Sequence, residues 1–472
     1  MRASAGQTRA TVPRVRRRLV GAAAVAAMVV PVAAFTAANG PRDPVRVSAG
    51  SPFARCSTAP AFTNAEVEPS LASDPHHPDR LIAVYQQDRY HSGGARGIVA
   101  AVSKDGGRHW RRLALPVSSC AGESARQAPF ASDPWVSAGP DGRIYVSTLS
   151  DVVSVMTSGD WGSSWSKPTI LHGSGLTDKP SVAADPRRAG TAYVVWSDYR
   201  QTNPPGTESD ELLSITDDAG RTWSTPRAIL RHGKGAGPED GQILVDPRSG
   251  RLYLLMAWVR NAAVSPADPA WMMIMSSDDR GVHWSRARRF GIGHPAPQRD
   301  RPLIRSSPQV PSFGIDRRGV LYAVWQDSRF SHGARDEVLF TTSSDGGMRW
   351  TTPRKVSAFS SAGAIIPTVA ASATGHVGIL YLQLDRGAGI PARYRLAISS
   401  DGGRHFGDET VSPTFSVADA PELTRGLLVP GGYFLGDYLG IAPLGTTSFG
   451  ALFVTASGAG DSETDVFYTS RP

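Results

Sequence analysis

Six copies of one eight-residue pattern run along the chain, and they restrict the possible folds more than any other feature. In each copy a Ser or Thr is followed two residues later by Asp, then by Gly, and an aromatic residue closes the pattern. The copies start 55 to 66 residues apart, at SKDGGRHW (103–110), SGDWGSSW (158–165), TDDAGRTW (216–223), SDDRGVHW (277–284), SSDGGMRW (343–350) and SSDGGRHF (399–406). A period in this range is typical of solenoids, propellers and arrays.

Each copy lies between two short runs that have the composition of β-strands. GIVAAVS (97–103) ends on the first residue of the first copy. WSTPRAIL (223–230) begins on the last residue of the third copy. Ser, Thr and Asp side chains bond to turn amides and Gly adopts positive φ, so the pattern predicts the turn of a hairpin. Two more strand-like runs precede each hairpin, as in EPSLASDP (68–75) and LIAVYQQ (81–87). We therefore expect an all-β protein of four-stranded units, the size of a propeller blade.

The number of blades depends on the last part of the chain. Residues 414–472 contain three further strand-like runs but no turn motif. DPVRVSAG (43–50) is a suitable fourth strand for this unit, and it would close the ring with strands from both chain ends and leave no open edge. We predict seven blades, with six blades and a C-terminal embellishment as the alternative.

The first 38 residues have the character of a targeting segment. RVRRR (14–18) is followed by the apolar run 19–38, with Ala34 or Ala38 as cleavage points. We expect a signal peptide at 1–38 and one propeller domain at 39–472, secreted or at the cell surface. An uncleaved membrane anchor is the alternative, because the apolar run is about long enough to span a bilayer. A cleaved protein would keep no stable membrane partner.

The net charge of +8 does not indicate a nucleic-acid partner. Six arginines lie within residues 1–38, and without them 44 Lys and Arg face 42 acids. The two cysteines, Cys56 and Cys120, flank the first repeat, and in an exported protein we expect a disulfide between them, with two free thiols as the alternative. Clustered metal-ligand motifs are absent from the sequence, so we predict no cofactor. Bound calcium is the alternative.

The repeated turn is similar to the Asp box, and the chain from about 60 to 470 resembles the sialidase (neuraminidase, BNR-repeat) superfamily. The resemblance implies a β-propeller that is often a glycoside hydrolase. In this superfamily an arginine in the first strand of blade 1 binds the substrate carboxylate, but here VEPS (67–70) places Glu68 there. The family acid/base is an Asp in the loop after the second strand of blade 1; here Asp88 lies at the start of that loop and no Asp follows Arg89, so this signature is missing. The nucleophilic tyrosine and its assisting glutamate correspond loosely to Tyr438 and Glu239.

Propeller geometry predicts the position of a site independently of this resemblance. The first strand of each blade lines the central channel, and the repeated turns lie on the opposite face from the starts of these strands, so we expect the turns to be structural. The charged residues at those starts, with the tyrosine beside the last of them, are Glu66, Glu68, Arg126, Asp178, Lys179, Glu239, Asp240, Arg305, Asp437 and Tyr438. We expect Tyr438, Glu239, Asp437 and Asp88 to be catalytic. The substrate-binding candidates are Arg89, Arg126, Arg305, Glu68, Asp178 and Asp240. Solvated charges around a water-filled channel are the alternative.

A second charged set recurs at the ends of the second strands, where repetition favours ion pairs between blades. Its members are Asp88–Arg89, Asp198–Arg200, Asp327–Arg329 and Asp385–Arg386.

Three functions fit the sequence. The first is a sialidase-like glycoside hydrolase that acts on glycans at the central funnel, with Tyr438 deprotonated by Glu239 or Asp437. The second is a non-catalytic propeller that binds glycan or protein, which the glutamate at position 68 favours. The third is a polysaccharide lyase on the same scaffold. We expect a glycan or glycoconjugate as the partner and a monomeric protein.

Overall fold

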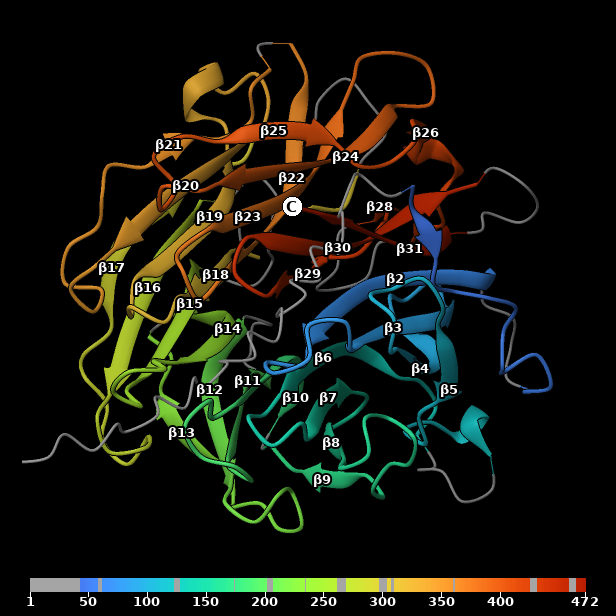
Figure 1. Cartoon of the computed structure of the whole chain (residues 1–472), viewed down its shortest axis with the longest axis vertical. Coiled ribbons are helices and arrows are strands. Elements are labelled where there is room, and N and C mark those ends of the chain that lie inside the picture. The colour runs from blue at the N-terminus through green and yellow to red at the C-terminus, as the bar shows by residue number, and fades with distance from the viewer. Residues whose placement is uncertain are drawn as a thin grey trace, which may run out of the picture. The chain divides into compact units, whose positions relative to one another are not determined.

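Strands make up nearly all of the regular structure in the computed structural model (Figure 1). The described residues are 43–57, 62–122, 128–173, 175–201, 207–233, 235–260, 269–296, 304–306, 310–359, 361–424, 431–457 and 464–472. The 3-10 helices in this part of the chain are η1 (Ser119–Ala121), η2 (Arg329–Ser331) and η3 (Val417–Asp419). Over the same ranges no helix has the length and hydropathy needed to cross a membrane. The predicted signal peptide and Arg126 lie outside the described residues.

Groups of four antiparallel strands follow one another along the chain, and within each group neighbours in sequence are neighbours in the sheet. The groups are β2 (Phe62–Ser73), β3 (Leu81–Arg89), β4 (Ala95–Ser103), β5 (Arg111–Ala114); β6 (Ser132–Ala138), β7 (Ile144–Leu149), β8 (Val153–Ser158), β9 (Thr169–Leu171); β10 (Leu176–Ala184), β11 (Ala192–Gln201), β12 (Thr207–Thr216), β13 (Arg227–Leu230); β14 (Ala236–Val245), β15 (Leu252–Arg260), β16 (Ala270–Ser277), β17 (Arg288–Gly293); β18 (Ser312–Ile315), β19 (Leu321–Asp327), β20 (Glu337–Ser343), β21 (Arg354–Lys355); and β22 (Gly363–Ala371), β23 (Val377–Leu384), β24 (Pro391–Ser399), β25 (Gly407–Thr410).

The last group combines strands from both ends of the described chain. It contains β29 (Gly440–Leu444), β30 (Ser448–Ala456), β31 (Thr464–Arg471) and β1 (Val45–Arg46), which pairs antiparallel with β31. One parallel pair, Ala65 with Thr464, joins this group to β2. Beside these groups, β26 (Phe415–Ser416) pairs with β24, and β27 (Glu422–Leu423) pairs with β28 (Gly432–Tyr433).

Hydrophobic layers lie between neighbouring groups. Alternate residues of a strand face opposite sides of its sheet, so each group offers one apolar face to the group before it and one to the group after it. On β19, Tyr322 and Val324 pack toward β22–β25, whereas Ala323 and Trp325 pack toward β14–β17. This alternation explains why the second and third strands of the sequence are nearly continuous apolar runs. Both of their faces are buried.

The six turn motifs are held by hydrogen bonds within each turn. In the first, Ser103 Oγ lies 2.8 Å from Asp105 Oδ1 and accepts from the Gly107 amide at 2.9 Å. The His109 amide donates to the same carboxylate, and the Trp110 indole donates to the Gly107 carbonyl, both at 3.0 Å. Gly107 has φ +85°, and a Cβ there would lie 2.1 Å from Cε1 of Tyr468. The motif thus ties a tight turn to the neighbouring group, as expected of a structural element.

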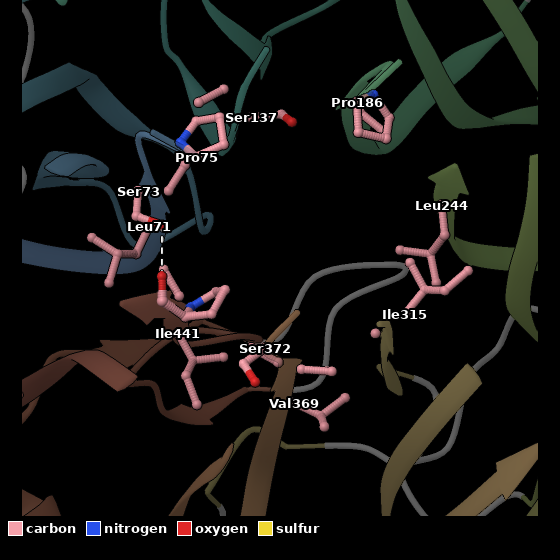
Figure 2. Close-up of a pocket in the computed structure, with 18 of the residues that line it drawn as sticks. Leu71, Ser73, Pro75, Ser137, Pro186, Leu244, Ile315, Val369, Ser372 and Ile441 are labelled. Atoms are coloured by element: carbon pink, nitrogen blue, oxygen red, sulfur yellow. Dashed lines mark hydrogen bonds between the residues drawn. The ribbon is translucent and has the colours of Figure 1, made fainter. Parts of the chain in front are cut away.

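The first strands of all seven groups line one cavity of about 450 Å³ (Figure 2). Figure 2 shows Leu71, Leu244, Ile315, Val369 and Ile441 around it. The cavity is at the end of these strands that leads into the turns to the second strands. The turn motifs lie at this end too, since the Gly106 amide donates to Asp79 O between β2 and β3. Four-stranded groups with their first strands around one cavity are consistent with a propeller-like fold.

Cys56 and Cys120 form a disulfide, with Cα atoms 5.2 Å apart. It joins the segment before β2 to η1, after β5, and so connects the two ends of the first group.

Candidate functional site

The other end of the first strands carries a repeated distortion. In β2, β6, β10, β14 and β22 the pairing with the second strand shifts register, and a non-glycine residue at each shift has φ between 47° and 53°. These residues are Glu68, Asp133, Lys179, Asp240 and Ile366. Left-handed backbone costs a non-glycine residue about 1–2 kcal/mol, so it persists only where the surroundings impose it. A bulge also redirects side chains. Here it redirects four charged ones.

Pro follows the left-handed residue in four of these bulges and Gly follows it in the fifth, Asp240. Proline has no amide hydrogen, so it fits where the ladder of hydrogen bonds is interrupted. The recurrence of Glu68-Pro69, Asp133-Pro134 and Lys179-Pro180 therefore marks the same structural position in three successive groups.

Lys179 lies at the centre of an ion-pair network that we term the Lys179 cluster: Glu68, Asp133, Lys179, Arg305 and Asp437. The ammonium nitrogen is 2.6 Å from Asp437 Oδ2, 2.8 Å from Asp133 Oδ1 and 3.7 Å from Glu68 Oε1. The Arg305 guanidinium is 2.9 Å from Asp437 Oδ2. A cavity of about 20 Å³ adjoins Asp133, Lys179, Asp240 and Tyr438. The structure thus brings together charges from segments that the sequence places more than 350 residues apart.

Burial and mutual repulsion raise the pKa of four acids at this end and so favour their protonated form. Burial, followed by Asp133, raises the pKa of Glu68 to about 8. Burial also raises the pKa of Asp178 to about 6, that of Glu239 to about 7 and that of Asp240 well above its ordinary value. Asp437 differs: despite its burial, Arg305 and Lys179 hold the pKa of this carboxyl below its ordinary value. The same fold thus keeps one carboxyl ionised and favours a proton on several others.

Glu239 has a tyrosine partner, and that tyrosine is Tyr199 on β11. The Tyr199 hydroxyl donates to Glu239 Oε1 at 2.6 Å. Burial and the Glu239 charge raise the pKa of this phenol well above its ordinary value. Asp178 contributes to the shifts of both groups, so the three residues interact electrostatically. A Tyr–Glu pair next to clustered cations is an arrangement suited to covalent catalysis on a sugar.

Tyr438, which the sequence analysis paired with Glu239 or Asp437, has a different partner. Its hydroxyl donates to the backbone carbonyl of Pro134 at 3.0 Å, and its ring lies 5.2 Å from that of Trp135. Burial, then Glu68, raises its pKa well above the ordinary value. The observed contact anchors the start of the last group to β6 and contains no base that would remove the phenolic proton.

Arg89 adjoins the Lys179 cluster, whereas Asp88 does not join it. Arg89 is fully buried, donates to the Phe434 carbonyl at 3.1 Å, and stacks with Arg305 on the Phe434 ring, at 4.7 and 4.5 Å from its centroid. Burial lowers the pKa of Arg89 to about 9. Asp88 instead accepts from Ser51 Oγ and the Asn64 amide, and its carboxylate is 3.4 Å from Arg96.

The ion pairs described for the aspartates and arginines at the ends of the second strands lie within groups, whereas we expected pairs between groups. Asp88 pairs with Arg96, Arg200 with Asp210, Asp327 with Arg329 and Asp385 with Arg393. Each of these pairs lies within one group. Strands in one sheet are about 5 Å apart, whereas packed sheets are about 10 Å apart. A short side chain therefore contacts a partner in its own sheet more easily than one in the neighbouring sheet.

The remaining predicted residues take these positions. Glu66 accepts from the Gln87 amide at 2.5 Å and lies near Asp465, away from the Lys179 cluster; burial raises its pKa well above the ordinary value. The sequence analysis missed Asp133 and Tyr199. The recurrence of an acid before Pro in a first strand was a usable signal for Asp133. Tyr199 lies in a second strand, and its pairing with Glu239 depends on the contact between two groups. Over the described residues, no group of three or more His, Cys, Asp or Glu is placed to hold a metal ion.

These features define an all-β repeat protein with a buried charge network at one end of its inner strands. Residues 207–425 match the family described as BNR repeat-like domain. This segment is just under half of the 472 residues. The match and the six turn motifs make the chain similar to BNR-repeat proteins. No curated protein matches the chain in sequence.

Solved structures similar to this chain include three carbohydrate-active enzymes. A Hadza microbial sialidase is 17% identical, with 86% of this chain and 66% of the sialidase covered at a TM-score of 0.43. The α-L-arabinanase of Penicillium chrysogenum is 11% identical, with 92% and 98% covered at 0.46. An ulvan lyase is 12% identical, with 86% and 94% covered at 0.49. The matched region spans just under two thirds of the sialidase.

Proposed function

We propose that the protein is a secreted, monomeric glycoside hydrolase with a seven-bladed propeller, and that it cleaves glycans at the Lys179-cluster end of the inner strands. The observation that carries the proposal is the Tyr199–Glu239 hydrogen bond of 2.6 Å, with Asp178 and the cation Lys179 acting on Glu239. The pairing of β1 with β31, which completes the seventh group from both chain ends, supports the blade number and the closed ring.

In this mechanism Tyr199 is the nucleophile. Its phenolic oxygen forms a bond to the anomeric carbon while its proton passes to Glu239, and the glycosidic C–O bond breaks. Asp178, whose pKa is raised to about 6, donates the proton that the leaving oxygen takes up. Water then attacks the anomeric carbon while Asp178 takes its proton, the bond from the sugar to the Tyr199 oxygen breaks, and Glu239 returns its proton to that oxygen, so that the anomeric configuration is retained. Arg305 is placed to bind an acidic or hydroxyl-rich sugar.

The test is sugar release from a panel of neutral and acidic glycans. Tyr199→Phe and Glu239→Gln should each lose at least about a thousand-fold in kcat, because each removes a group that acts in bond formation. Tyr438→Phe is the matched control and should retain activity, since its hydroxyl contacts only the Pro134 carbonyl. Undiminished turnover in Tyr199→Phe, or loss confined to Tyr438→Phe, would reject the assignment.

A second function, a non-catalytic propeller that binds glycan or protein, is favoured by one observation. The ammonium of Lys179 is already surrounded by three carboxylates, so much of the charge is neutralised inside the protein. This alternative predicts saturable binding in the same panel with no product at any time. A polysaccharide lyase would instead release a product with ultraviolet absorbance from its new double bond.

A further inference from the structure

Glu211 on β12 interrupts the repeat at a position that is otherwise apolar. It lies five residues before the first residue of its turn motif. The residues at the same spacing before the other five motifs are fully buried and are aliphatic or aromatic: Ile98, Val153, Met272, Val338 and Tyr394. Glu211 is fully buried as well. A carboxyl group therefore occupies a core position, where an acid is rare unless it has a partner.

The carboxyl group of Glu211 lies at the contact between its own group and β14. Ser197 on β11 is directly opposite Glu211, and Tyr199 is two residues further along the same strand, so the three side chains share a face. Across this contact Tyr199 donates its hydrogen bond to Glu239. A Cβ on Gly241 would clash with Glu211 Oε1. The side chain of Glu211 thus fills the space that a larger residue would need, which explains why this bulge has glycine where the others have proline.

Glu211 and Glu239 each have one oxygen without a partner. Glu211 Oε1 and Glu239 Oε2 are buried and accept no hydrogen bond from a described residue. The other oxygen of Glu211 accepts from Ser197 Oγ at 3.3 Å, and no lysine or arginine of the described chain pairs with it. By contrast, Glu337 on β20 is almost fully buried and has the ammonium of Lys355 at 2.7 Å. Because a buried carboxylate without a cation is strongly unfavourable, the surroundings of Glu211 favour its protonated form.

The charges around this contact favour the same distribution of protons. Burial, and after it the charge of Glu239, raises the pKa of Glu211 to about 8, whereas burial raises the pKa of Glu239 to about 7. As the pH rises, Glu239 therefore ionises first, and Glu211 keeps its proton while the pair carries one negative charge. On β13, Leu230 is opposite Glu211 and carries no charge. The other titratable groups that interact with Glu239 are Asp178, Lys179, Tyr199, Asp240 and Asp437.

We propose that Glu211 is a positioning residue for Glu239, which keeps a proton and donates it in a hydrogen bond to the Glu239 carboxylate. This bond satisfies both unpartnered oxygens, because a carboxylic acid has one O–H donor and a carboxylate only accepts. It favours the ionised form of Glu239 and leaves Oε1 to receive the phenolic proton of Tyr199. Glu211 itself is fully buried and acts only through Glu239. The inference rests on the proposed function, because it concerns how the proposed base is kept ionised.

The first experiment compares kcat/KM for sugar release at two pH values. Glu211→Leu introduces the apolar side chain typical of the other groups and removes the donor, so the pKa of Glu239 should rise. At pH 5, where the ionised fraction of Glu239 limits the reaction, kcat/KM should fall about ten-fold. At pH 8, where Glu239 is largely ionised, it should stay within about two-fold of the wild type.

Two further variants separate this role from packing. Glu211→Gln keeps an N–H donor and should restore most of the loss at pH 5. Val338→Ala removes core volume at the equivalent position of another group and should change the two pH values equally. An equal fall at both pH values in Glu211→Leu, or no fall at pH 5, overturns the proposal.

The second experiment does not depend on turnover. Carbon-13 NMR of protein labelled at the glutamate carboxyl carbons follows the ionisation of Glu239, whose signal is assigned by its loss in Glu239→Gln. Glu239 should titrate at higher pH in Glu211→Leu than in the wild type or in Glu211→Gln, and identical titrations overturn the role of Glu211. If Glu239→Gln abolishes sugar release while these titrations are identical, the proposed hydrolase survives and the positioning role fails. If the titration moves but the wild type hydrolyses no glycan, the positioning role survives and the proposed hydrolase fails.

Discussion

The two ends of the inner strands have opposite chemistry although they belong to the same strands. At one end, β2, β6, β10 and β14 are bulged and carry Glu68, Asp133, Lys179 and Asp240 in left-handed backbone. At the other end the same strands are regular and line a cavity with Leu71, Leu244 and neighbouring small residues. The bulges thus occur at the same position in several repeated strands, but the charged side chain at each bulge differs from group to group.

The pKa shifts of Asp160 and Glu68, which lie at the two ends, have opposite directions. The exposed turn-motif aspartates accept several hydrogen bonds, which favour the ionised form, and the pKa of Asp160 is lowered to about 2 in this way. The acids around the Lys179 cluster are buried, and burial raises the pKa of Glu68 to about 8. Asp160 therefore keeps a fixed charge state at neutral pH, whereas the protonation of Glu68 changes near neutral pH.

Removing the positive charge of Lys179 tests whether the acids around it depend on this cation for the stability of the fold. Lys179→Met leaves Asp133, Asp437 and Glu68 close together without their shared partner. We expect a loss of about 3–5 kcal/mol in the free energy of unfolding, measured by chemical denaturation. Lys179→Arg keeps the charge and should recover much of that loss. A Lys179→Met protein as stable as the wild type would show that the acids are protonated and need no cation.

Adding one methyl group at Gly107 tests whether the turn motif stabilises the fold. Gly107→Ala would place Cβ against Tyr468 in a left-handed backbone, so we expect a loss of about 2–4 kcal/mol with activity per folded molecule unchanged. Gly50→Ala is the matched control, because no atom lies within 4 Å of its Cβ position, and it should be neutral. Comparable thermal unfolding of the two variants would contradict the structural role of the motif.

The dependence of stability on pH should separate the two ends. The folded-state pKa of Glu68 is above its unfolded value, so its contribution is complete below about pH 4.5 and is lost as the pH rises toward 8. The folded-state pKa of Asp160 is below its unfolded value of about 3.8, so its contribution is present above that pH and is lost as the pH falls toward 2. Melting temperatures across pH should show Glu68→Gln flattening the alkaline limb and Asp160→Asn flattening the acid limb. Identical profiles of melting temperature against pH for the two variants would contradict the opposite pKa shifts of Glu68 and Asp160.

The smallest effect is expected in the cavity wall. Leu244→Ser changes a half-buried side chain that already faces open space, so we expect less than about 1 kcal/mol of destabilisation and unchanged sugar release. A large fall in turnover with intact stability would indicate that the active site lies at the cavity end of the inner strands and not at the Lys179-cluster end.

Much of the fold was predictable because it repeats. The six turn motifs predict four-stranded units, and the apolar runs predict strands buried on both faces. The sequence also placed Glu68 and Lys179 among the charges at the starts of the first strands. The predicted partnership of Tyr438 with Glu239 was not obtained, because hydroxyl geometry depends on side-chain direction at a contact between groups, which no periodicity encodes.

The sequence by itself determined the repeat unit, its all-β character and the frame role of the turn motif, because these depend on local hydrogen bonding and on alternation along a strand. Only the tertiary structure decided which charges meet. Lys179 contacts Asp437 across 258 positions of sequence, and Tyr199 takes Glu239 from the next group. Such contacts follow from the packing of whole sheets and from bulges that redirect single side chains, so they appear only when the groups are assembled.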